Sequence, residues 1–285
     1  MVDLLVINTL NGIVYGLILF MVASGLTLSM GLMGYINLAH GALFAFGGGV
    51  GATVFFWSGS FPLAILASMV TAGLIGLVIE RGFLRHIAGL FVPQILVTIG
   101  FLFILENIHI WIWRAQVFEP VTVPALAGTI ALPFTGDLFP IYRIFVIFIV
   151  LAIAAGFFYF DRTRLGALIR AGMDDSQMVE GMGINISRIH VLVFAAAAAA
   201  AGLAAALALP VFGNSYQSAF EILLLSLIVT VVGGMGSVRG AFVFALVAGV
   251  LTTYGKVLIP ETAMFLLYAL MVVVLAFKPS GLFGR

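Results

Sequence analysis

The sequence predicts an all-α, polytopic helical membrane protein, because its composition is apolar and its apolar stretches are long. Of its 285 residues, 64% are hydrophobic and 8% are charged, and the mean hydropathy is +1.28. About a quarter of the residues in a soluble domain are charged, so this chain has too little charge to cover a surface in water. Its 12 basic and 11 acidic residues nearly cancel, which argues against a nucleic-acid partner. We expect residues 1–285 to form a single transmembrane domain.

A transmembrane helix needs about 20 mostly apolar residues. Nine stretches meet this need: 5–30, 38–57, 62–80, 91–112, 143–160, 189–210, 220–236, 240–257 and 261–277. We therefore expect eight or nine transmembrane helices. Between the first two stretches, residues 31–40 contain Gly31, Gly34, Asn37 and His40. This segment is either a tight turn or a helix that is broken or re-entrant inside the membrane.

Most basic residues fall in alternate connections between these stretches. The sets are Arg81 and Arg85; Arg162, Arg164, Arg170 and Arg188; Arg239; and Lys278 and Arg285. The positive-inside rule puts such connections in the cytoplasm. The loop at about 161–188 and the C-terminus are then cytoplasmic, and the loop at about 113–142, with four prolines, is external. The N-terminus is outside if residues 31–40 turn between two full spans, and inside if they re-enter.

The internal loop contains a pattern typical of one short helix. Asp174-Asp175-Ser176 offers N-cap side chains, and Gly183 is a natural C-terminal stop. The pattern predicts a helix at about 175–182 with an apolar side made of Met178, Val179 and Met182. A helix this short is not stable alone in water, so we expect it to lie against a partner.

Polar side chains inside the membrane are costly and often functional. Asn37 and His40 lie near the break after the first stretch. They either contact a translocated substrate or satisfy free carbonyl groups of a broken helix. Glu106 and Asn107 lie in the outer half of the fourth stretch. They either line the outer mouth of a path, or the carboxylate of Glu106 pairs with Arg114 near the interface.

No catalytic or metal-binding pattern is present. The chain has no cysteine, its four histidines are scattered, and no glycine-rich segment continues as Gly-Lys-Ser/Thr. We expect neither an enzyme nor a chain that holds a metal or cofactor. If ATP drives transport, the ATPase site is on another chain.

Three glycine pairs have the small-xxx-small spacing that lets transmembrane helices approach closely. They are Gly12/Gly16, Gly47/Gly51 and Gly236/Gly240. Close helix packing and a functional hinge are both consistent with this spacing.

Four segments carry recognisable motifs. The first, residues 25–41, contains Gly-Tyr-Ile-Asn37-Leu-Ala-His40-Gly41. The others are residues 170–185, residues 232–241 with Gly-Gly-Met-Gly236-Ser, and residues 278–285 with Pro-Ser-Gly-Leu-Phe-Gly284. Together they resemble the motifs of permeases of branched-chain amino acid ATP-binding-cassette (ABC) importers, and they occur in the family's order. Arg239 stands where relatives often carry proline. This departure does not alter the family, but the resemblance leaves the substrate open.

The resemblance implies a half-transporter in a bacterial or archaeal cytoplasmic membrane. It implies a related second permease, two cytoplasmic ABC ATPases that use the ATP, and an extracytoplasmic binding protein that delivers a branched-chain or other apolar amino acid. The expected contacts with the ATPase are Arg170, Asp174, Asp175, Met178, Glu180, Met182, Gly183 and Asn185. The alternative for the charged members is that they only solvate a loop.

Two other functions remain open. Permeases with the same architecture import urea or short amides, and no residue of this chain excludes those substrates. An ion-coupled secondary transporter would call for paired charges deep in the spans, and Glu106 alone lies at a suitable depth.

Overall fold

All nine predicted apolar stretches are helical in the computed structural model, which describes residues 2–132 and 136–284. They are α1 (Val2–Met33), α2 (His40–Ser58), α3 (Phe61–Gly82), α4 (Phe91–Trp113), α5 (Ile141–Asp161), α8 (Ile186–Phe212), α9 (Ser218–Gly233), α10 (Val238–Leu258) and α11 (Ala263–Phe277). Among the described residues, seven of these helices are long and apolar enough to cross a membrane, whereas α9 and α11 are shorter. The prediction of a polytopic helical membrane protein is confirmed.

The connections contain smaller elements. These are α6 (Arg164–Asp174), α7 (Ser176–Gly181), the 3-10 turns η1 (Leu84–Ile87), η2 (Pro124–Leu126) and η3 (Pro260–Thr262), and the antiparallel strands β1 (Thr129–Ala131) and β2 (Leu138–Pro140). In the strand pair, Ile130 lies opposite Phe139.

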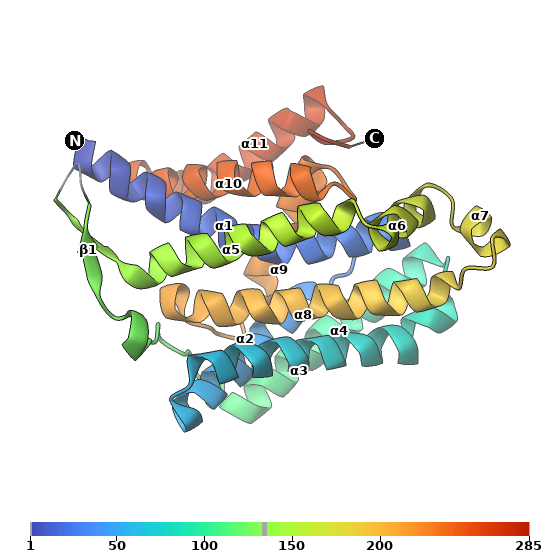
Figure 1. The fold of residues 1–285 in the computed structure, drawn as a ribbon, viewed down its shortest axis with the longest axis horizontal. Coiled ribbons are helices and arrows are strands. Elements are labelled where there is room, and N and C mark those ends of the chain that lie inside the picture. Colours follow the sequence, from blue (N-terminus) through green and yellow to red (C-terminus); the bar gives the residue numbers. More distant parts are fainter. Residues whose placement is uncertain (1, 133–135, 285) are drawn as a thin grey trace.

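The long helices run roughly along the long axis of the molecule (Figure 1). The N-terminus lies at the same end as β1, and α6 and α7 lie at the opposite end. We refer to these as the β1 end and the α7 end. The loops at 113–142 and 161–188 are therefore at opposite ends of the bundle, as the alternating crossings predict.

Helix α1 packs mainly on α10, and α3 packs mainly on α8. Glycine allows the first of these contacts. A Cβ atom on Gly12 would stand 2.7 Å from the Cα of Val250, and one on Gly16 would stand 2.6 Å from the carbonyl oxygen of Ala245. Since real Cβ atoms do not approach so closely, the spacing of this glycine pair serves helix packing.

The segment after α1 turns back into the bundle. Gly34 has a φ of +71°, and α2 begins at His40, whose Nε2 lies 3.0 Å from the carbonyl oxygen of Val22. Val22 is 11 residues, or about 16 Å, before the end of α1. Helix α2 therefore starts inside the bundle and runs to the β1 end, where Phe56 stacks on Phe118. Thus α1 crosses completely, as in the two-span interpretation, and α2 is a continuous helix whose first residue lies inside the bundle.

Helix α9 also begins inside the bundle, which explains its 16 residues. Gly41 of α2 faces Ala219 and Leu223 of α9, and a Cβ on Gly41 would stand 2.7 Å from the Leu223 Cβ. The N-termini of α2 and α9, two helices that run in opposite directions, therefore meet in the interior. Each helix N-terminus carries a partial positive charge.

Candidate functional site

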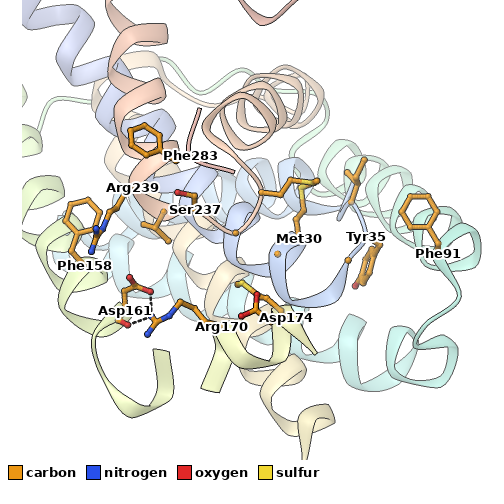
Figure 2. Close-up of a pocket in the computed structure, with 17 residues that line it drawn as sticks. Met30, Tyr35, Phe91, Phe158, Asp161, Arg170, Asp174, Ser237, Arg239 and Phe283 are labelled. Atoms are coloured by element: carbon orange, nitrogen blue, oxygen red, sulfur yellow. Dashed lines mark hydrogen bonds and ion pairs between the residues drawn. The ribbon is translucent and has the colours of Figure 1, made fainter. Parts of the chain in front are cut away.

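A cavity of about 690 Å³ opens at the α7 end, and all four motif segments contribute to it (Figure 2). The first segment supplies Met30, Gly31 and Tyr35. The second supplies Arg170, Met173 and Asp174, the third Ser237 and Arg239, and the fourth Phe283. Segments separated by about 250 residues in the sequence thus form one site.

Main-chain turns hold the third and fourth segments together. Gly234 and Gly236 have φ values of +105° and +78°, a left-handed conformation that glycine adopts without steric cost. The amide of Leu282 donates to the carbonyl of Val232 at 2.8 Å, and that of Phe283 donates to Gly233 at 3.1 Å. The C-terminal motif therefore completes one wall of the cavity by pairing with the end of α9.

Both signs of charge line the cavity. Arg170 on α6 forms an ion pair with the carboxylate of Asp161 and also donates to the Asp161 carbonyl, which ties α6 to the end of α5. The two side chains are 33% and 39% exposed. Asp174 lies at the end of α6, the helix that carries Arg170, and Arg239 comes from α10 on another wall (Figure 2). Such a lining can interact with a molecule or surface that carries both charges.

Tyr35 lies deep at this site, and sequence reasoning did not single it out. Its hydroxyl and one carboxylate oxygen of Glu80 are buried, and neither has a hydrogen-bond partner among the described residues. Burial, followed by the nearby Glu80 carboxyl, raises the pKa of Tyr35 far above its usual range. The hydroxyl therefore stays protonated and remains available as a donor.

The predicted helix in the 161–188 loop is α7, and its caps are those that the pattern indicates. Asp175 Oδ1 accepts a hydrogen bond from the amide of Met178 at 2.9 Å, and Gly183 has a φ of +82°. Asn185 instead caps α8, because its Oδ1 accepts from the amide of Arg188 at 3.0 Å. Gly183 and Asn185 thus set the turn between α7 and α8.

The apolar side chains of α7 and of the residue after it do not all face the bundle. Val179 is 1% exposed and packs against a cluster that includes Ile169 and Ile186. Met178 and Met182 are 66% and 59% exposed. Asp174, Asp175 and Glu180 are also exposed. Helix α7 is therefore anchored by one side chain and presents two methionines, flanked by carboxylates, away from the bundle.

Sequence reasoning missed α6, the helix that carries Arg170. Thr163 caps it, with its Oγ1 accepting from the amide of Gly166 at 3.3 Å. Leu165, Leu168 and Ile169 have the i, i+3, i+4 spacing of an amphipathic helix. This spacing is the feature of the sequence from which α6 could have been predicted.

The four path candidates lie at two depths and do not meet. Asn37 Oδ1 accepts from the amide of Ala39 at 3.1 Å, and Asn37 and His40 are both buried at the start of α2. Glu106 and Asn107 lie on α4 near the β1 end, where Glu106 is half-buried and Asn107 is exposed. None of the four lines the cavity at the α7 end.

Comparisons with known proteins agree with this architecture. The family described as "Branched-chain amino acid transport system / permease component" matches residues 8–275. The chain is 28% identical to the high-affinity branched-chain amino acid transport system permease protein BraD of Pseudomonas aeruginosa, over 96% of this chain and 94% of that protein. It is 26% identical to the permease protein LivH of the corresponding system in Escherichia coli K12, with the same coverage of both chains.

A solved structure shares the fold. PsaBC from Streptococcus pneumoniae in complex with Fab superposes with a TM-score of 0.53 at 13% identity, covering 96% of this chain and 92% of that chain. The family match extends over nearly the whole chain and includes every helix that lines the cavity. The chain therefore belongs to the family of permease components of branched-chain amino acid transport systems.

Proposed function

We propose that this chain is the permease subunit of an ATP-driven importer for branched-chain or other apolar amino acids. The observation that carries the proposal is the convergence of four family motifs on one cavity at the α7 end. The names of the relatives support the substrate class. The subunit has no catalytic role of its own: ATP is hydrolysed by partner subunits, and this chain needs no cofactor.

The α7 end faces the cytoplasm in this proposal. Nine of the 12 basic residues belong to segments that the positive-inside rule assigns to that side. The C-terminal motif, paired with α9, is then cytoplasmic, and the β1 end faces outward. The membrane is the cytoplasmic membrane of a bacterium or archaeon.

Helix α7 docks on one of two cytoplasmic ATPases. Its outward methionines supply an apolar contact, and Asp174, Asp175 and Glu180 supply charge around it. Nucleotide-driven movement of the ATPase passes through Val179 and α6. The Arg170–Asp161 pair carries it to α5. Rigid-body shifts of packed helices are an established way of transmitting such movement.

The second permease covers exposed surfaces of α4 and of the start of α9, two helices that both pack on α2. Asn107 on α4, Glu221 on α9 and Gln217, which directly precedes α9, are exposed, although polar groups are costly against lipid. Polar side chains stabilise contacts between membrane helices. A binding protein delivers substrate at the β1 end, and the path between the two permeases passes Glu106 and Asn107. Asn37, His40 and the helix N-termini beside them are buried inside this subunit, so they provide polar contacts at mid-depth only after the start of α2 moves to open them to the path.

Reconstitution in liposomes tests the proposal. The chain is assembled with its ATPases, second permease and binding protein, and uptake of radiolabelled leucine and urea is compared with and without ATP on the cytoplasmic side. We expect leucine uptake that requires both ATP and the binding protein. Uptake of urea but not leucine would show that the proposed substrate is wrong, while the proposed importer architecture would stand. Uptake without ATP would contradict the proposal and favour an ion-coupled carrier.

A further inference from the structure

A second cavity of about 630 Å³ forms an apolar groove lined by residues of α1, α5, α6 and α8. Helices α5 and α8 can be followed side by side in Figure 1. Helices α5 and α8 form its walls, and α1 forms its floor through Gly25 and Leu28. Every lining residue is glycine, alanine, valine, leucine, isoleucine or phenylalanine. Its volume lies within the range of about 300–1,000 Å³ that small-molecule sites occupy.

The helices themselves confine the groove to one half of the bundle. Toward the β1 end, the hydroxyl of Tyr142 on α5 donates to the carbonyl of Leu207 on α8 at 2.8 Å and holds the two helices together. Toward the α7 end, the small residues Gly156, Ala196 and Ala200 leave the space between them open. Leu165, Leu168 and Ile169 of α6 close the groove at its end.

Three exposed arginines lie where the helices that line the groove end or begin: Arg162 directly follows α5, Arg164 begins α6 and Arg188 is in the first turn of α8. Arg164 directly precedes the lining residue Leu165. Arg188 lies one turn before the lining residue Leu192, on the same face of α8. Within residues 2–132 and 136–284, none of the three has an ion pair, and the nearby carboxylate of Asp161 is held by Arg170. Helices α6 and α8 also begin here, and their N-termini add partial positive charge.

We propose that this groove binds one anionic phospholipid, with an acyl chain along the groove and the phosphate among the three arginines. In the orientation given under Proposed function, on which this point rests, the arginines place the lipid in the cytoplasmic leaflet. A lipid fits better than a partner helix, because an apolar channel with a cationic rim at one end matches an acyl chain that leads to an anionic headgroup. Basic pockets between transmembrane helices are known to hold anionic headgroups.

Native mass spectrometry of the purified transporter complex tests the proposal. The delipidated complex is mixed with phosphatidylglycerol or with phosphatidylcholine of the same acyl chains, and retained lipid is counted. We expect selective retention of phosphatidylglycerol. Arg164→Gln/Arg188→Gln should weaken that selectivity about tenfold or more. The matched control Arg81→Gln/Arg85→Gln removes two exposed arginines from the same end, away from the groove, and should keep it.

A second variant tests the acyl chain. Ala196→Leu/Ala200→Leu fills the groove at positions that are exposed or half-buried, so the fold tolerates it while the arginines stay in place. We expect this variant to retain less phosphatidylglycerol. When inorganic phosphate is added instead of lipid, we expect the variant and the wild type to bind the same amount. This difference separates a lipid site from a site for a free anion. Equal retention of both lipids by the wild type, or an equal loss in the Arg81/Arg85 control, would overturn the proposal.

Occupancy of the groove by the second permease would also overturn it. The natural chain has no cysteine, so a Leu192→Cys variant carries a single thiol at the open edge of the groove. Labelling by a lipid-soluble maleimide in the assembled complex supports a lipid-facing groove. Cross-linking to the second permease contradicts it. Because neither assay measures transport, a different transported substrate would leave these results unaffected.

Discussion

Glycine at positions 12 and 16 sets the distance between α1 and α10. The ideal Cβ positions at these residues fall within 3 Å of the α10 backbone, which cannot move away without shifting the helix. A larger side chain in a close-packed interior forces such shifts and costs about 1–3 kcal/mol. The close approach of the two helices therefore depends on the absence of a Cβ atom at both glycines.

Gly16→Leu should lower the free energy of unfolding by about 1–3 kcal/mol. Gly100→Leu is the matched control, since it makes the same change in another span at a position with no atom within 4 Å of the added Cβ. Denaturant unfolding of the two purified variants in detergent measures the difference. Equal losses would show that leucine disturbs any span and that the α1–α10 contact has no special role.

Asn37 and His40 each make a hydrogen bond at the start of α2. The variant Asn37→Ala/His40→Ala should lose about 1–2 kcal/mol of stability. If these side chains also contact substrate, two quantities should fall in the variant: leucine uptake per folded transporter, and the ATP hydrolysis that is coupled to uptake. Ser24→Ala is the control, because it removes a buried hydroxyl that is bonded only within α1. Unchanged uptake by the double variant would leave the two residues with a helix-starting role alone.

The sequence singles out polar residues inside spans but does not give their neighbours. Asn37 and His40 could be predicted as unusual because polar groups are costly in the membrane. Tyr35 and Glu80 could not, since a tyrosine and an acid near helix ends are ordinary. Only the packing of distant helices around them buries the Tyr35 hydroxyl and one Glu80 oxygen, and leaves both without a hydrogen-bond partner in the part of the chain that the structure describes.

At the scale of elements, α7 depends on the bundle for its stability. Six residues do not hold a helix in water, and Val179 supplies its contact with the hydrophobic cluster beneath. The charged cap pattern made this helix predictable. Helix α6 has 11 residues and carries Arg164 and Arg170. Because its mean hydropathy is low, a search for apolar stretches does not find it, and only the helical spacing of its apolar residues predicts it.

Met178→Ser/Met182→Ser should weaken the affinity of the permease complex for its ATPase about tenfold or more, because exposed apolar side chains that become buried dominate docking. The stability of the permease should not change, since both methionines point away from the bundle. Gln177→Ser on the same helix is the control. Retention of ATPase on immobilised permease complexes measures affinity, and equal binding by both variants would contradict docking through α7.

For the whole molecule, the helices of the nine apolar stretches follow from the sequence, but their depth in the bundle does not. Each predicted apolar stretch is a helix because length and hydropathy are local properties. The interior starts of α2 and α9 depend on where residues 34–39 and 213–217 turn back, and these turns are set by contacts across the bundle. The convergence of four motifs on one cavity has the same cause, since it needs segments at both ends of the chain.

Single-cysteine labelling tests the sidedness of the whole molecule. Glu119→Cys lies in the loop at the β1 end, and Gln177→Cys lies on α7; both native side chains are exposed. In intact cells, a membrane-impermeant maleimide should label position 119 only, and position 177 should react after permeabilisation. The wild-type chain, without cysteine, gives the background. The reverse pattern would invert the proposed orientation.

The pairing of α1 with α10 also constrains how the protein is made. Most of α1 is buried, yet the helix that covers its glycine face follows more than 200 residues later. During synthesis α1 must therefore wait in lipid without that neighbour. Two of its hydroxyls have hydrogen-bond acceptors even before α10 is present. Ser24 and Ser29 donate to the carbonyls of Met21 and Leu26 within α1 itself. Insertion of α1 can thus precede assembly, and the bundle closes only after α10 has entered the bilayer.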